Sequence, residues 1–294
     1  MPISPAGRKE ATPRHGSART APAATMSLVA LAAVILFGSL ACGGGGQAPA
    51  SSSGASSPAG GDSKGAPAAP PGAIADGTAI GTGAVSGKAT FTGTPPPRKK
   101  ISMTAEAACH KPGSGEALSD DLIVDAGGAL RNVWVRVVSG LEGKAFAPPS
   151  AQVELDQAGC LFSPHVLLAR AGQSIMFRNS DATLHNINAL AKVNRGFNLS
   201  LPNAGMSVTR NFAKPEAVRL KCDVHAWMSA WIVVNDTPFQ ALTGEGGTFA
   251  IDGLPAGTYG IEAWHERLGT SRQEVTLADG ERKEIAFAFS APAR

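Results

Sequence analysis

Residues 76–294 contain no sustained apolar stripe with the 3.6-residue period of a helix. Short runs instead alternate or are wholly apolar, and Gly, Pro, Asn and Asp separate them. In residues 132–138, for example, Val133, Val135 and Val137 point to one face of an extended chain. The pattern predicts an all-β fold built as β-sandwiches. The predicted strands are residues 84–91, 132–138, 153–155, 166–168, 174–179, 207–212, 218–221, 231–234, 248–251, 258–264, 274–277 and 284–289.

The first 42 residues predict export. A basic, irregular start precedes an uncharged apolar run over residues 26–41, which ends in small residues just before Cys42. This order is typical of a signal peptide. The run is shorter than the roughly 20 residues of a comfortable membrane-spanning helix, although residues 21–25 could extend it into an uncleaved anchor. We therefore expect residues 1–42 to be a signal peptide or a membrane anchor, and the protein to be periplasmic or at the cell surface, tethered to the membrane.

Cys42 is a candidate site of lipidation. The residues Ser39-Leu40-Ala41-Cys42 resemble the box that precedes the lipidated cysteine of bacterial lipoproteins. In such a protein Cys42 would carry the lipid and become the mature N-terminus. Ser39 departs from the box, which favours Leu there. The alternative is ordinary cleavage after Ala41, which would leave a free thiol at Cys42.

Residues 43–75 predict a flexible linker. They are nearly all Gly, Ala, Ser and Pro, with Asp62 and Lys64 as the only charges. Such a segment has too little apolar surface to offset the entropy of ordering. Its 33 residues would span roughly 30 Å on average. A linker of that reach can hold a domain near a membrane while letting it reorient.

The charge balance argues against nucleic acid as a partner. The four basic residues and one acidic residue of positions 1–42, taken from totals of 26 and 23, leave 22 of each sign. The exported part is therefore neutral, and its only basic run is Arg98-Lys99-Lys100. Phosphate binding needs a stronger positive surface than this.

One short segment carries a set of metal-binding side chains. Cys222, His225 and Met228 follow one another at three-residue spacing, between a predicted strand and the apolar run 230–234. Thiolate and thioether together select copper over hard cations, and two histidines, one cysteine and a weak axial methionine form a blue-copper site. His185 is the best second imidazole, because it follows an apolar strand and a turn. Zinc is a minor alternative, since methionine is a poor zinc ligand.

The same region resembles the cupredoxins, and most closely the amicyanin and plastocyanin group. The similarity covers about residues 151–235. It is carried by Phe162-Ser163-Pro164, Ala171-Gly172, residues 177–181, His185-Asn186 and the loop 221–228. The resemblance implies a Greek-key β-sandwich over residues 145–237.

The resemblance also implies residue roles. His185, Cys222 and His225 would be the equatorial copper ligands and Met228 the axial one, with one type 1 copper as the cofactor. Asn186 matches the position that steadies the thiolate loop, in keeping with the need to orient ligands. In the resembled family the loop histidine presents its edge at the surface, which implies His225 as the electron port. The departure is Asp223-Val224, where a proline commonly precedes the second histidine.

Two cysteines remain if Cys42 takes lipid and Cys222 takes metal. Cys109 and Cys160 are then candidates for a disulfide, since exported proteins reside in oxidising compartments. A bridge around a loop of about 50 residues would stabilise the fold by roughly 4 kcal/mol. The alternative is a second metal site that uses Cys109 with His110, or Cys160 with His165.

The remaining segments resemble a carboxypeptidase regulatory-like, or transthyretin-like, sandwich. The similarity is carried by residues 246–251 and 254–259, with 85–91 and 132–138 as opening strands. About 55 residues after the cupredoxin region are few for an independent core. We therefore expect one discontinuous sandwich, formed by residues 76–144 and 238–294 and interrupted by the cupredoxin domain.

These features predict a membrane-tethered electron-transfer carrier that docks transiently to redox partner proteins. Two alternatives are a copper carrier or buffer without redox duty, and a structural cell-surface protein with a vestigial copper site. An enzyme is not expected. The six histidines include no HxH pair for further coppers, and the sequence has no CxxCH haem motif and no nucleophile-base arrangement.

Overall fold

The computed structural model describes residues 69–104, 106–109 and 116–291. All of them belong to one compact unit, Gly60–Arg294. The predicted signal or anchor segment 1–42, with Cys42, lies outside the described residues, as do His110 and most of the linker 43–75. No helix in the described ranges has the length and apolar character needed to cross a membrane.

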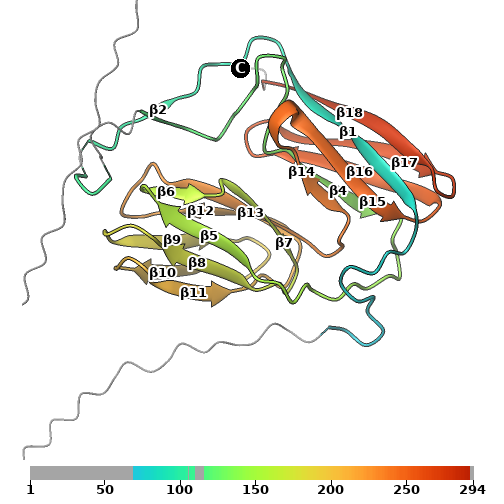
Figure 1. Cartoon of the computed structure of the whole chain (residues 1–294), viewed down its shortest axis with the longest axis horizontal. Coiled ribbons are helices and arrows are strands. Elements are labelled where there is room, and N and C mark those ends of the chain that lie inside the picture. The colour runs from blue at the N-terminus through green and yellow to red at the C-terminus, as the bar shows by residue number, and fades with distance from the viewer. Residues whose placement is uncertain (1–68, 105, 110–115, 292–294) are drawn as a thin grey trace, which may run out of the picture. The chain divides into compact units, whose positions relative to one another are not determined.

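The all-β prediction is confirmed. Within the described residues the only helical element is a single 3-10 turn, η1 (Glu245–Gly247). The strands form four main sheets, and a small hairpin pairs β2 (Lys100–Ile101) with β3 (Ala117–Leu118). In Figure 1 the colour of the strands follows their order along the chain, from blue toward the N-terminus to red toward the C-terminus.

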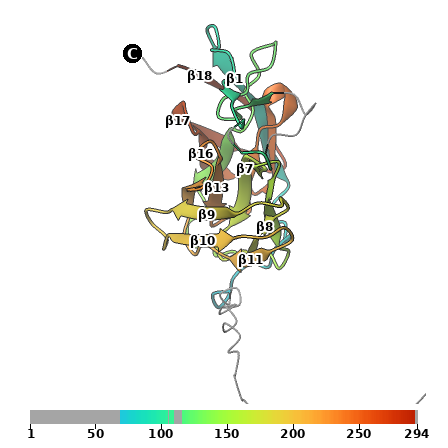
Figure 2. The same cartoon turned by 90° about the vertical axis from the view of Figure 1, so that its left-hand side faces the viewer.

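The strands between residues 153 and 235 form the first sandwich, which we call the central sandwich. It comprises β5 (Val153–Ala158), β6 (Leu161–Ser163), β7 (Val166–Arg170), β8 (Ile175–Asn179), β9 (His185–Leu190), β10 (Phe197–Leu201), β11 (Ser207–Arg210), β12 (Glu216–Lys221) and β13 (Ser229–Asn235). One sheet has the order β10-β9-β12-β13-β7 and the other β11-β8-β5-β6. Figure 2 shows the neighbouring strands β9 and β10 of the first sheet.

Alternation of apolar and polar residues builds the core of the central sandwich. In β8, Ile175 and Phe177 are fully buried, whereas the alternating residues Met176 and Arg178 are partly exposed. Strand β13 is buried along most of its length instead. Ile232 faces the core of the central sandwich, whereas Val233 packs with Trp134 in a separate apolar cluster. Burial on both faces explains why this strand is a continuous apolar run.

Strands β9 and β10 lie outside the predicted strands. Polar residues such as Asn186 and Asn188 in β9 and Asn198 in β10 interrupt their apolar pattern. Asparagine is depleted in strands, so the sequence signal is weak. The long-range pairing of β9 with β12 supplies the backbone hydrogen bonds that hold this segment extended.

Strands from both ends of the described chain form the second sandwich, which we call the flanking sandwich. It comprises β1 (Gly83–Thr92), β4 (Trp134–Ser139), β14 (Gln240–Leu242), β15 (Thr248–Leu254), β16 (Gly257–His265), β17 (Gly269–Leu277) and β18 (Arg282–Ser290). Its sheets have the orders β15-β1-β18 and β14-β4-β16-β17. Each sheet therefore joins strands that precede the central sandwich to strands that follow it.

A buried histidine of the flanking sandwich gives a pH prediction. His265 ends β16, is 1% exposed, and its Nδ1 accepts a hydrogen bond from the backbone N–H of Arg267. Burial lowers the pKa of His265 to about 4. Between pH 6.5 and 4 its imidazole is therefore protonated in the unfolded chain but neutral in the folded chain. This group should remove about 3 kcal/mol of stability as the pH falls through that window.

Urea unfolding at pH 7.5, 5.5 and 4.5 measures this loss, and His265→Gln should flatten the decline. His165→Gln is the matched control with the opposite sign. Burial lowers the pKa of His165, but its bond to Glu266 outweighs burial and raises the pKa. Its contribution is therefore present below pH 6.5 and lost above. An equally steep acid decline in wild type and His265→Gln would contradict the prediction.

Candidate metal centre

The loop between β12 and β13 is closed by backbone hydrogen bonds. The N–H of Cys222 donates to the carbonyl of Met228 at 3.2 Å, and the N–H of Met228 donates to the carbonyl of His225 at 2.9 Å. The N–H of His225 points at the Cys222 sulfur, at 3.4 Å. The loop therefore holds two of its three predicted ligands, Cys222 and His225, close together.

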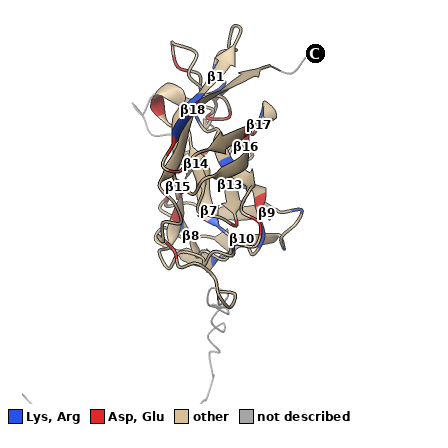
Figure 3. Cartoon of the chain, turned by 90° about the vertical axis from the view of Figure 1, so that its right-hand side faces the viewer, with Lys and Arg blue, Asp and Glu red and all other residues tan. Residues whose placement is uncertain are grey.

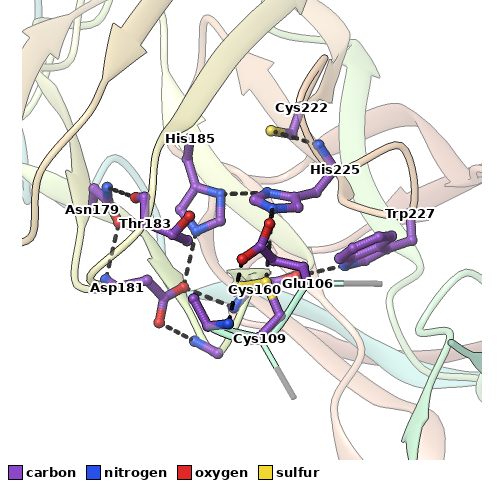
Figure 4. Close-up of a disulfide and its surroundings, with 12 residues drawn as sticks. Glu106, Cys109, Cys160, Asn179, Asp181, Thr183, His185, Cys222, His225 and Trp227 are labelled. Carbon is purple, nitrogen blue, oxygen red and sulfur yellow. Dashed lines mark hydrogen bonds and ion pairs between the residues drawn. A yellow bond between two sulfur atoms is a disulfide. The ribbon is translucent and has the colours of Figure 1, made fainter. Parts of the chain in front are cut away.

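His185 meets this loop from the start of β9. Its Nδ1 lies 2.9 Å from Nδ1 of His225. His185, Cys222 and His225 each offer one ligand atom to a group in which these atoms all lie within 4.8 Å of one another. Two nitrogens bound to one ion at about 2.0 to 2.1 Å lie within about 4 Å of each other, so the imidazole pair fits a shared ion. Figure 4 shows the two rings facing each other beside Cys222.

The three donors are removed from solvent. His185 is 0% exposed, and Cys222 and His225 are each 2% exposed. Met228 is also fully buried and belongs to the same apolar cluster as Cys222. Two imidazoles, a thiolate and a nearby thioether are the donors that suit copper, so the residues present fit that metal.

Asp181 holds His185 from the side opposite the metal position. Its Oδ2 accepts a hydrogen bond from Nε2 of His185 at 3.0 Å, which leaves Nδ1 free to bind a metal. The same carboxylate accepts the backbone N–H groups of Gly159 at 2.8 Å and Cys160 at 2.7 Å. Asp181 is therefore fixed by the β5–β6 turn and in turn fixes the ligand.

Asn186 ties the thiolate loop to β9. Its Oδ1 accepts hydrogen bonds from the Cys222 thiol at 3.3 Å and from the N–H of Asp223 at 2.6 Å. Its Nδ2 donates to Oδ2 of Asp223 at 2.9 Å, and Asn188 and Asn198 also donate to that carboxylate. This asparagine network anchors the loop from outside.

The surroundings of Cys222 lower the pKa of its thiol. Burial raises the pKa of its thiol, but hydrogen bonds from His185 and from neighbouring amides outweigh burial and lower the pKa overall. Burial likewise lowers the pKa of His185, yet its bonds to Cys222 and Asp181 raise it overall. The pKa of His225 is lowered by burial and by the neighbouring His185. A metal ligand must be deprotonated, so a low thiol pKa prepares Cys222 for that role.

Cys109 and Cys160 form a disulfide beside this centre. Sγ of Cys109 lies 3.7 Å from Nε2 of His225. Because both sulfurs are bonded to each other, neither is a thiolate ligand in this structure. His165, the partner considered for a second metal site, forms a hydrogen bond with Glu266 instead.

The expected exposure of His225 is wrong. The resemblance implied a surface edge at this histidine, but a segment before β3 covers it, with Glu106 3.9 Å and Cys109 3.7 Å from its Nε2. Glu106 and Asp181 are the site residues that the sequence did not point out. Asp181 lies in a polar turn that looks like any surface turn, and Glu106 lies more than 100 residues before the loop that it contacts.

No family model matches the chain, and no curated protein matches it. Similar solved structures include a Cu-containing nitrite reductase from Thermus scotoductus SA-01, with 24% identity over 34% of this chain and a TM-score of 0.27. This chain spans only 25% of that enzyme. A purple cupredoxin from Nitrosopumilus maritimus is 22% identical over 28% of this chain and 98% of its own length, with a TM-score of 0.24.

A Cu(I) structure of an amicyanin mutant is 19% identical over 34% of this chain and 97% of its own length, with a TM-score of 0.26. The structural neighbours are thus cupredoxins and a copper enzyme, each similar to part of the chain. Because every TM-score lies below 0.5, the side-chain geometry alone supports the metal centre.

Removing the Asp181 carboxylate should weaken copper binding and shift the reduction potential. Asp181→Asn takes away the charge that holds Nε2–H of His185, and loss of such an outer partner typically costs about 10 to 100-fold in metal affinity. Copper titration and potentiometry measure both effects. Asp156→Asn is the matched control, since Asp156 bonds Ser180 in the same region without touching a histidine. Equal affinities and potentials in the two variants would contradict this role.

Proposed function

We propose that this chain is a copper-binding electron carrier. The observation that carries the proposal is the convergence of His185, Cys222 and His225, which are buried and whose ligand atoms lie within 4.8 Å of one another. Bound copper would supply a one-electron couple between its cupric and cuprous forms. The chain's own residues would hold the ion, with Met228 as the weak axial donor.

The rigidity of the pocket supports electron transfer over metal delivery. Each of the three donors is held by a second contact: His185 by Asp181, Cys222 by Asn186, and His225 by the closed loop. A cage of this kind changes little when the metal changes oxidation state. A protein that delivers copper ions would need its ligands to move apart and release the metal. The contacts that hold these three ligands oppose such a movement.

The wider assignment follows from the same proposal. We propose that the chain is not an enzyme, and that it is exported and tethered to a membrane by residues 1–42, directly or through lipid on Cys42. The flanking sandwich would be a carboxypeptidase regulatory-like domain. Lys, Arg, Asp and Glu positions are interspersed along the ribbon (Figure 3), which suits weak, transient docking to redox partners better than binding to a strongly charged polymer.

Copper titration of the purified full-length chain tests the proposal. One equivalent of cupric ion should produce an intense visible thiolate-to-copper band, and potentiometry should give a reversible one-electron couple. Binding without a reversible couple would favour a copper buffer and overturn the redox role. Failure to bind copper at all would overturn the metal centre itself, and only a structural role would then remain.

A further inference from the structure

A short segment lies directly over the candidate copper site. We call it the cap, and it comprises the described residues 100–104 and 106–109. Two turns shape it: the N–H of Glu106 donates to the carbonyl of Met103 at 3.1 Å, and the N–H of Cys109 donates to the carbonyl of Glu106 at 3.0 Å. The β2–β3 pairing fixes its base, as does the hydrogen bond from the N–H of Ser119 to the carbonyl of Lys99.

The cap covers the outer edge of His225. Nδ1 of this ring faces His185, so the opposite nitrogen, Nε2, would face a partner protein. That nitrogen lies 3.7 Å from Sγ of Cys109 and 3.9 Å from Oε2 of Glu106. Figure 4 shows the Glu106 carboxylate and the disulfide against this edge. Together with Trp227, whose ring centre lies 5.0 Å from that of His225, these groups leave His225 2% exposed.

The disulfide is the strongest described link between the cap and the central sandwich. Met103, at 8% exposed, belongs to the apolar cluster that contains Cys222, and the half-buried Ile101 packs against the same cluster. The Glu106 side chain is 39% exposed, so its attraction to His225 is weak. Without the covalent bond, two apolar side chains, Ile101 and Met103, and a partly solvated carboxylate would remain to hold the cap against the central sandwich.

We propose that the cap is a cover released by reduction, so that the Cys109–Cys160 disulfide controls access to the outer edge of His225. This role rests on the proposed function, since it deepens the account of how electrons reach the copper. It also names a second kind of partner, a dithiol protein able to reduce the bond.

The reaction is thiol–disulfide exchange. A thiolate of the dithiol attacks Sγ of Cys109, the more exposed of the two cysteines, and the bond to Cys160 breaks. The second thiol of the dithiol then attacks the mixed disulfide. The products are two cysteine thiols and the oxidised dithiol, so two electrons and two protons pass to the chain.

Release of the cap should leave the metal pocket intact. Asp181 is held by the backbone N–H groups of Gly159 and Cys160, not by the Cys160 sulfur. The carbonyl of Cys160 also accepts the indole N–H of Trp227 at 3.0 Å. We expect both contacts to persist after reduction, so that His185 stays in position. Departure of Cys109 and Glu106 would then uncover the part of the His225 edge that Cys160 and Trp227 do not border.

Histidine modification by diethyl pyrocarbonate tests the cover without requiring copper. The metal-free full-length chain is compared with its Cys109→Ser/Cys160→Ser variant and with wild type reduced by dithiothreitol, using mass spectrometry to read each histidine. Opening of the cap should raise the modification rate of His225 by roughly tenfold or more. His265, which is 1% exposed and lies in the flanking sandwich, is the internal reference for folding.

The outcomes separate the alternatives. A rise in the modification rate of His225 alone supports the cover. An unchanged rate at His225, in the double serine variant or in reduced wild type, overturns it when His265 is still protected. If His265 also becomes reactive in both reduced forms, the bond is structural and cannot serve as a release, which overturns the proposal as well. Met103→Ala with the disulfide intact should leave His225 protected, which shows that the covalent link holds the cap.

A copper-loaded arm reads the consequence for electron transfer. Hexacyanoferrate(II) should reduce the cupric form of the double serine variant roughly tenfold faster than the disulfide-bonded chain, because its approach to His225 is open. Equal rates would overturn the gating role. Absence of the visible copper band in both forms would refute the proposed function, while the modification data would still decide whether the cap opens.

Discussion

Cys222→Ser is expected to abolish the intense visible band of the copper-loaded protein. The band requires a thiolate bound to cupric ion, and Cys222 is the only free cysteine among the described residues. A serine hydroxyl of similar size does not ionise at neutral pH and is a hard donor. Absorption and paramagnetic resonance of the titrated variant measure the change, together with loss of the reversible couple.

Asn188→Ser is the matched control for this variant. Asn188 donates to the carboxylate of the loop residue Asp223 at 3.0 Å and has no described hydrogen bond to a ligand side chain. We expect this control to keep the band. An intense band that survives in Cys222→Ser would show that another group binds the copper, and the proposed centre would be wrong.

Loss of the disulfide is expected to lower the free energy of unfolding by about 4 kcal/mol. The bond closes a loop of 51 residues, and the entropy removed from the unfolded chain sets this magnitude. The loop includes β4, so the bond joins a segment that carries part of the flanking sandwich to the β5–β6 turn of the central one. Denaturant unfolding of the Cys109→Ser/Cys160→Ser variant measures the loss.

Wild type unfolded in excess dithiothreitol is the control, because it lacks the same bond without any substitution. Its midpoint should match that of the double variant. A domain of this kind is stable by roughly 5 to 15 kcal/mol, so both forms should remain folded at room temperature. A loss below about 1 kcal/mol would mean that the reduced chain keeps the loop closed by other contacts.

The disulfide and the candidate copper ligands lie next to each other. The sulfur of Cys109 lies 3.7 Å from the imidazole of a candidate ligand, and the backbone of Cys160 holds Asp181, which holds the other imidazole. Removing the disulfide should therefore lower stability while leaving the copper band in place. Replacing Cys222 should abolish the copper band while leaving the stability contributed by the disulfide in place.

Much of the metal centre could be predicted from the chain alone. Cys222, His225 and Met228 lie within seven residues, and a tight loop after a strand keeps such neighbours together whatever the rest of the fold does. The alternating pattern of strands such as β8 is equally local, because a side chain's face depends only on its position in the pleat. These features explain why the all-β fold and the ligand loop were predictable.

The tertiary structure decided what lies around that loop. The contact of Cys109 with His225 joins residues 116 apart, and nothing in either local sequence indicates it. Asp181 looks like an ordinary turn residue until β9 brings His185 within 3.0 Å of it. The burial of His225 also depends on distant contacts. The pairing of β2 with β3 and the disulfide place Glu106 and Cys109 against its ring. Residue type and spacing select the metal, whereas access to the metal depends on distant segments that only the folded chain brings together.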